Sequence, residues 1–277
     1  MARHPGIVIR ALSWNLFHGR DAPPNPALFT WRSRLLRVTE RDDTHVQVNR
    51  CLLPEFAGKL AGWDWDIALL QEAPPDWLRP LAQAARASGA SVLTSRNVGH
   101  LARTLVARVN PDLIASHEGG SNQVLARPPW RLAEVRRHTL TLCPERRRMI
   151  WVRMEHPEQG AICAATLHAT AHVPKAAERD VREAALTALD WSGELPLVFG
   201  GDMNLRPAET ELFDWLSREH GFSQPTAPNA IDHILARRLE VAEPPRRLPP
   251  EARELPQPCG RVLRLSDHAP VAAAFVR

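Results

Sequence analysis

Short runs of valine, isoleucine and leucine recur along the chain, and Gly, Pro or Asp bounds most of them. Runs of this kind are typical of β-strands. They predict strands at Ile7–Trp14, Asp66–Gln71, Leu101–Val109, Ser121–Ala126, Leu132–Thr141, Met149–Met154, Ala161–Leu167, Leu195–Gly200, Ile231–Ala236 and Pro270–Val276.

Apolar residues at three- and four-residue spacing predict helices over Val46–Leu60, Asp76–Ser88 and Lys175–Trp191. The last is the clearest, because Val181–Leu189 carries an apolar stripe with charges on the opposite side. Several consecutive strands have no helix between them. This order favours mixed or antiparallel sheets with helices outside over a strict alternation of strand and helix.

The proline-rich segments Asp21–Pro26 and Glu243–Pro258 are interpreted as long surface loops, because neither separates two halves that each look complete. We therefore expect one domain over residues 1–277. The chain has 44% hydrophobic and 24% charged residues, which is ordinary for a soluble globular protein.

The formal charge of +4 permits an anionic partner without selecting one. Lys59 and Lys175 are the only lysines, so nearly all the positive charge is arginine, which binds phosphate with a bidentate fork. The four cysteines are far apart and form no metal-binding pattern. With neither a signal-peptide run nor a stretch long enough to span a membrane, the sequence predicts a cytoplasmic protein.

Polar side chains follow the predicted strands directly, where a sheet edge exposes them to water, metal and substrate. The motifs are Ser13–Asn15, Leu70–Glu72, Thr166–His168, Gly201–Asn204, Ile231–Ile234 and Ser266–His268. Each alone has an ordinary structural interpretation: Asp202 and Asn204 suit a turn, Glu72 a solvated strand end, and His168 a hydrogen-bonded core histidine. Together and in this order they indicate one site.

With these motifs the sequence resembles the endonuclease/exonuclease/phosphatase superfamily, which includes deoxyribonuclease I, repair nucleases, neutral sphingomyelinases and inositol polyphosphate 5-phosphatases. The resemblance runs from Ile7 to Val276. It implies an α/β (α+β) fold, a four-layer αββα sandwich in which two mixed sheets pack face to face with helices outside. The site is expected at one edge, where the strand ends meet.

The resemblance also implies roles for individual residues. Glu72, Asn15 and Asp267 match the ligands of a divalent metal, usually Mg²⁺, with Mn²⁺ as a possible substitute. Asp202 matches the residue that orients or deprotonates the attacking water, and Asn204 a phosphate contact.

Two histidines complete the implied catalytic set. His268 matches the histidine on the scissile phosphate, Asp232 the carboxylate that orients it, and His168 a second histidine near the phosphate. With less weight, Asn122 and either Arg146 or Arg147 match substrate-side residues, and His18 and Arg20 are placed to overhang the site.

Elementary chemistry agrees with these roles. Hydrolysis of a phosphate ester places negative charge on oxygens, which suits a hard cation held by carboxylate and amide oxygens. Imidazoles and an amide supply donors to the same oxygens, and a His–Asp pair sets the tautomer. Either Asp202 or His268 can take the proton from water, and we favour Asp202.

Departures from the family pattern narrow the expected substrate. Phe17 stands where abasic-site endonucleases carry a second acidic ligand, and His168 stands where they use tyrosine, a residue this chain lacks. We expect a metal-dependent phosphodiesterase, with nucleic acid as the favoured substrate. A phosphatase or phospholipase C-type enzyme on the same fold is the alternative, and a non-catalytic binding module is the rival from another class.

Two further expectations concern the surroundings of the site. The segment Arg20–Val48 is expected to help form a lid on the substrate side. Gly200 and Gly201 are expected to keep side-chain bulk away from the position of the substrate phosphate.

Overall fold

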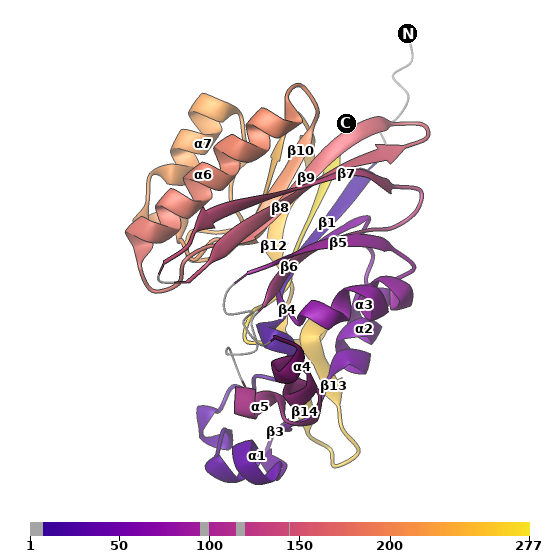
Figure 1. The fold of residues 1–277 in the computed structure, drawn as a ribbon, viewed down its shortest axis with the longest axis vertical. Helices are drawn as coiled ribbons and strands as arrows, with labels where there is room; N and C mark the ends of the chain where they lie inside the picture. The colour runs from indigo at the N-terminus through magenta and orange to yellow at the C-terminus, as the bar shows by residue number, and fades with distance from the viewer. Residues whose placement is uncertain (1–7, 95–99, 115–119, 144) are drawn as a thin grey trace.

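Two large sheets pack face to face in a computed structural model of the chain, and helices cover both outer sides (Figure 1). The structure describes residues 8–94, 100–114, 120–143 and 145–277. Ile7, the predicted first residue of the first strand, lies outside them.

The first sheet is mixed and has the strand order β12-β15-β1-β4-β6-β5. Its strands are β1 (Val8–Asn15), β4 (Ile67–Ala73), β5 (Ser88–Leu93), β6 (Ser121–Ala126), β12 (Glu240–Arg247) and β15 (Val271–Val276). The central strands β1 and β4 run parallel, so their carboxyl ends lie at the same edge.

The second sheet has the order β11-β10-β9-β8-β7, and its strands β9 and β10 are also parallel. Its strands are β7 (Arg131–Thr141), β8 (Arg147–His156), β9 (Gly160–His168), β10 (Leu197–Asp202) and β11 (Asp232–Arg237). A small third sheet joins β13 (Glu254–Pro256), β14 (Val262–Arg264), β3 (His45–Gln47) and β2 (Glu40–Arg41).

The α-helices are α1 (Trp31–Leu36), α2 (Leu53–Gly62), α3 (Leu78–Ala84), α4 (His100–Val109), α5 (Pro111–Ile114), α6 (Pro174–Ser192) and α7 (Leu212–His220). Short 3-10 turns are η1 (Phe17–Gly19), η2 (Pro26–Leu28), η3 (Pro75–Trp77), η5 (Pro207–Glu209) and η6 (Pro250–Arg253). Within the described ranges, none of the helices is long and apolar enough to cross a membrane.

Three apolar layers hold the sandwich together. Between the sheets, Ile67 and Val124 belong to the same buried cluster as Val152 and Val198. On the outer faces, α2 and α3 pack against the first sheet, and α6 and α7 against the second. The central strand β10 is therefore covered on both sides, which explains its continuous apolar run. The predicted four-layer αββα fold is confirmed.

The prediction of a strand at Leu101–Val109 is wrong, because this segment forms the helix α4. Its branched and apolar residues suggested a strand, but Thr104 and Ala107 are its buried positions and are three residues apart. Leu105 and Val109, four residues apart, are exposed on another side of the helix. The buried positions therefore follow the period of a helix, although the larger apolar side chains Leu105 and Val109 do not lie among them.

Three other segments were only partly predicted. Val46–Leu60 begins as β3, and its helix starts at Leu53, with Pro54 in the first turn. Asp76–Ser88 ends as a helix at Ala84, and Ser88 opens β5, a strand the sequence analysis missed. The predicted loop Glu243–Pro258 contributes to β12 and β13. Its prolines are tolerated because β12 is an irregular edge strand.

Gly200 and Gly201 precede Asp202 at the end of β10. The neighbouring strands leave no room for a side chain at either position. A Cβ at Gly200 would lie 2.6 Å from the His233 carbonyl oxygen, and one at Gly201 would lie 2.1 Å from that of Leu167. Gly201 also has φ of +141°, which side chains rarely adopt. The close approach of adjacent backbones is sufficient to require these glycines, and the expectation that they make room for substrate phosphate stays a prediction.

We expect Gly201→Ala to lower the free energy of unfolding by about 3 kcal/mol or more, because backbone atoms cannot move away as a side chain can. Chemical denaturation would measure the loss. Gly58→Ala on α2 is the matched control: its added Cβ meets nothing within 4 Å, so a gain of about 0.5–1 kcal/mol is expected. Equal stability of Gly201→Ala and the parent chain would contradict this account.

Candidate active site

The predicted polar residues converge where the parallel strand pairs of both sheets end. Asn15 ends β1 and Asp202 ends β10, and a hydrogen bond of 2.9 Å from Asn15 Nδ2 to Asp202 Oδ2 joins the two sheets. The register of the second sheet places Asp202 beside His168 on one side and Asp232 on the other. Sheet pairing thus assembles residues that are far apart in the sequence.

Asp202 lies at the centre of this cluster and is buried. Its Oδ1 accepts the backbone N–H of Asn204 at 3.1 Å, and its Oδ2 is 3.5 Å from His168 Nε2 and 3.7 Å from His268 Nε2. Burial and the charge of Asp232 raise the pKa of Asp202 to about 6, against the opposing effects of His268 and Asn15. The carboxylate is therefore mainly ionised at neutral pH.

His268 and Asp232 form a hydrogen-bonded pair, with 2.8 Å between His268 Nδ1 and Asp232 Oδ2. Burial alone would lower the pKa of His268, but Asp232 and Asp202 outweigh it and raise the pKa well above 6.5. The ring is therefore an imidazolium at neutral pH. It donates from Nδ1 to Asp232 and presents Nε2–H toward Asp202.

His168 has the opposite character. Burial and the cationic Arg147 lower its pKa well below 6.5, so the ring is neutral. Arg147 Nη1 lies 3.1 Å from His168 Nδ1, and a guanidinium can only donate. Nδ1 is thus the acceptor, and the proton is on Nε2, facing Asp202. Arg147 is itself buried and is held by Glu145 at 2.8 Å.

Glu72 projects from a bulge in β4, where its φ is +47°. Its Oε1 lies 3.5 Å from His168 Nδ1 and its Oε2 3.3 Å from His18 Nε2. Burial, followed by the charges of Asp202 and Asp267, raises the pKa of Glu72 to about 7. The carboxyl group therefore lies within the same electrostatic cluster.

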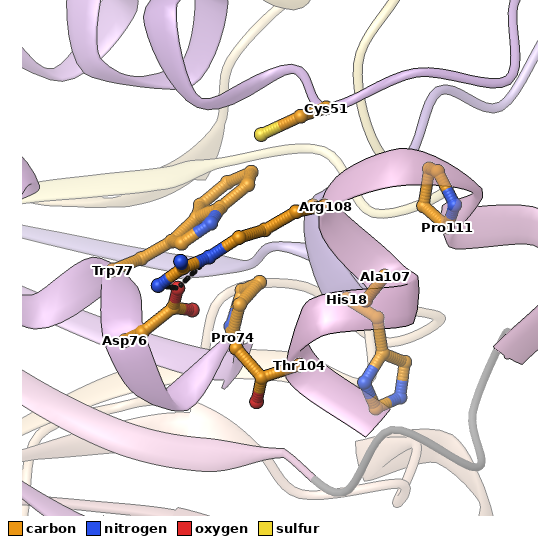
Figure 2. A pocket seen from close by; sticks show the side chains of 10 residues that line it. His18, Cys51, Pro74, Asp76, Trp77, Thr104, Ala107, Arg108 and Pro111 are labelled. Carbon is orange, nitrogen blue, oxygen red and sulfur yellow. Dashed lines mark hydrogen bonds and ion pairs between the residues drawn. The ribbon is translucent and has the colours of Figure 1, made fainter. Parts of the chain in front are cut away.

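His18 lies directly beside Glu72, closer to the cluster than its sequence position indicated. It lies in a tight left-handed turn directly after β1, with φ of +54°, and its Nδ1 is buried without a partner in the described chain. Figure 2 shows its ring beside α4 at a cavity that Thr104 and Arg108 also line. The cavity volume is about 10 Å³, enough for one water molecule, so substrate must bind elsewhere.

Ser266 also has a positioning contact that the sequence analysis did not assign. Its Oγ donates to the Asn15 carbonyl oxygen at 2.7 Å and accepts the His268 N–H at 3.1 Å, which ties the two motifs together. The presence of this serine in the Ser-Asp-His motif was the sequence feature that could have indicated the contact. Asn204 is held by its amide, which donates to the Ala169 carbonyl oxygen at 3.1 Å.

The remaining predicted residues lie at the margin of the cluster. The Asp267 side chain is 47% exposed, and its Oδ1 is 3.9 Å from His268 Nε2. Asn122 is buried and donates to the Arg148 carbonyl oxygen at 2.8 Å, while its own Oδ1 has no protein partner among the described residues. Arg146 donates to the Thr94 carbonyl oxygen. Of the two arginines considered, Arg147 is therefore the one that contacts the cluster.

The oxygen donors fit a hard divalent cation. Glu72 and Asp267 offer carboxylates, and the side-chain amide oxygen Oδ1 of Asn15 accepts one hydrogen bond, from the Phe17 N–H, leaving a second lone pair. Asp202, Asp232 and His268 also place one ligand atom each within 4.8 Å of one another. In that second group, however, the protonated His268 has no lone pair for a metal, which leaves two carboxylates, whereas the first set offers two carboxylates and an amide oxygen.

The chain belongs to the endonuclease/exonuclease/phosphatase family, whose model matches residues 12–268. Members of this family are hydrolases of phosphate esters and include phosphatases and nucleases. No curated protein sequence gives a significant match to the chain.

Solved structures share the fold over nearly the whole chain. A Bacteroides thetaiotaomicron mannosyl-6-phosphatase has a TM-score of 0.65 at 15% identity, covering 97% of this chain and 100% of the other. The catalytic domain of human Nocturnin with bound sulfate has 0.61 at 17%, covering 99% and 94%. D. rerio TDP2 complexed with a single-strand DNA product has 0.58 at 14%, covering 98% and 99%. At these identities the likeness shows the fold alone.

In metal-free protein we expect the His268 imidazole to stay protonated well above pH 6.5. In Asp232→Asn its pKa should fall by about one pH unit or more, since the neighbouring negative charge is lost while burial remains. Nitrogen-detected NMR titration would measure both. Asp190→Asn, an exposed position on α6, is the charge-matched control. Identical His268 titration in the parent chain and Asp232→Asn would refute the assigned pairing.

Proposed function

We propose that the protein is a divalent-metal-dependent phosphoesterase that cleaves phosphodiester bonds, with nucleic acid as the favoured substrate class. The observation that carries the proposal is the convergence on Asp202 of Asn15, His168 and His268, from the ends of three different segments. An ionised carboxylate beside a neutral imidazole and an imidazolium suits the attack of water on phosphorus.

Glu72, Asn15 and Asp267 are the proposed metal ligands. A bound Mg²⁺ or Mn²⁺ would act as a Lewis acid that stabilises charge on the phosphate oxygens. The raised pKa of Glu72 supports this assignment, because burial and the carboxylates of Asp202 and Asp267 leave it short of positive charge.

Asp202 is the proposed general base. Its pKa of about 6 leaves it ionised at neutral pH, yet basic enough to accept a proton from the attacking water. The contacts from Asn15 and Asn204 hold one oxygen each and fix the carboxylate plane. As the water oxygen bonds to phosphorus, its proton passes to Asp202 and the ester oxygen opposite departs.

His268 is the proposed donor to the phosphate rather than the base, because its imidazolium has no free lone pair. His168 supplies a neutral donor from Nε2, and Arg147 fixes that tautomer from behind. In these assignments Asp202 is the base, because it is ionised at neutral pH, and His268 is a hydrogen-bond donor, because it is protonated there.

The charge balance supports a diester over a monoester. Four carboxylates lie in or beside the cluster, those of Glu72, Asp202, Asp232 and Asp267. When ionised, these four carboxylates and Glu145, which pairs with Arg147, would carry five negative charges, against four positive charges from Arg147, the His268 imidazolium and one bound divalent cation. No excess positive charge is left for the second negative charge of a phosphate monoester.

We expect Asp202→Asn to lower kcat for bis(p-nitrophenyl) phosphate by about 10²–10⁴-fold, the usual contribution of a general base. Release of p-nitrophenol in Mg²⁺ measures it, and EDTA should silence the parent protein. Asp43→Asn, an exposed position outside the cluster, should retain full turnover. Unchanged turnover in Asp202→Asn would sink the mechanism, and better turnover of p-nitrophenyl phosphate would favour the phosphatase alternative.

We expect Glu72→Gln to weaken Mn²⁺ binding by about 10-fold or more, because a charged ligand becomes neutral. Calorimetric titration of the metal measures this without any turnover. Glu219→Gln, exposed on α7, controls for the loss of one negative charge. Equal affinity in all three proteins would remove Glu72 from the metal site.

A further inference from the structure

A groove of about 520 Å³ lies beside the catalytic cluster and shares a wall with it. Asn204 and Ile231, which precedes Asp232, are among its lining residues and connect it to the cluster. The loop before α6 and the segment after Asn204 form its sides. This volume is in the range of small-ligand sites and suits a unit about the size of one nucleotide.

Basic side chains line this groove and are weakly neutralised. His172 and Lys175 make no hydrogen bond or ion pair within the described chain, and Lys175 lies in the first turn of α6, where the helix dipole adds positive potential. Arg206 Nη1 is 3.6 Å from Glu209, in a pair with both side chains about half exposed or more. Such exposed pairs are weak, so a phosphate can compete for the guanidinium.

Glu209 and Glu178 also line the groove, and Glu178 is already engaged by two other side chains. Its carboxylate is shared between Arg182 at 3.5 Å and Thr210 at 3.3 Å. His172 has φ of +61°, an uncommon conformation for a residue with a side chain. The groove therefore offers an anion contacts that the fold itself leaves unused.

The charged residues of the adjoining surface are all acidic, whereas the first groove combines basic residues with Glu178 and Glu209. A second, more open groove of about 560 Å³ continues past Glu178 and Glu209 and is also lined by Glu211 and Asp214. A phosphate that reached these carboxylates would be repelled. The basic residues are therefore confined to the first groove, whose volume suits one nucleotide.

We propose that the first groove binds the nucleotide unit on the Asn204 side of the scissile phosphate, and that Lys175 and Arg206 bind one further phosphate on that unit. This inference rests on the proposed function and narrows its substrate class to phosphodiesters whose flanking nucleotide carries a second phosphate. The acidic neighbour disfavours a longer strand on that side.

The test compares the binding of two nucleotides by calorimetry in Mg²⁺. Thymidine 3′,5′-bisphosphate should bind the parent protein about 10-fold more tightly than thymidine 5′-monophosphate, the size of one charge-assisted contact or two weaker ones. In the double variant Lys175→Ala/Arg206→Ala the preference should disappear, so that the two nucleotides bind with about equal affinity. Arg218→Ala, which removes an exposed arginine of α7 away from the groove, should keep the preference and the thermal stability.

Equal affinity of the parent protein for both nucleotides would overturn the inference, as would a preference that survives in the double variant. Failure of the proposed function has a separate signature, the absence of bis(p-nitrophenyl) phosphate hydrolysis by the parent protein. Tighter binding of a long single strand than of the bisphosphate would show that the acidic groove does not limit the substrate.

Discussion

The hydrogen bond from Asn15 to Asp202 joins the two sheets at the edge where their parallel strands end. Each sheet alone would present its polar residues to water. Face-to-face packing instead buries Asp202, and its carboxylate must then find partners, because an unpaired buried charge is costly. Asn15, Asn204 and the two histidines meet that need, so the same packing that stabilises the sandwich assembles the site.

Burial also separates the titration behaviour of similar groups. His168 faces Arg147 and stays neutral, while His268 faces Asp232 and stays charged. The two histidines both lie near Asp202, but one is a neutral donor and the other a charged donor. Glu72 reaches the cluster only because a bulge in β4 turns it inward, with His18 behind it. These contacts gather ionised and neutral donors at one edge of the sandwich.

Much of the fold and of the catalytic cluster was predictable from the sequence. The buried strand β10 is a continuous apolar run and the long helix α6 has a clear helical period, and the boundaries of both were predicted within one or two residues. The failures have physical causes. Leu101–Val109 is rich in branched residues but helical, and the prolines of Glu243–Pro258 hide an edge strand because edge strands need fewer backbone donors. Asp202, His168, His268 and Asp232 were all named and lie together, and their roles remain a proposal.

By itself the sequence determined which residue types follow the strands, and hence the family and the chemistry available to it. Only the tertiary structure decided which histidine is charged, which of the two neighbouring arginines turns inward, and why the glycines before Asp202 are required. It also decided that Asn204 borders a groove in which Lys175 has no ion-pair partner among the described residues and Arg206 has a weak one. Contacts of this kind join residues far apart in the chain, and burial sets their electrostatics. Local sequence patterns carry no information on these long-range contacts or on the burial of the groups involved.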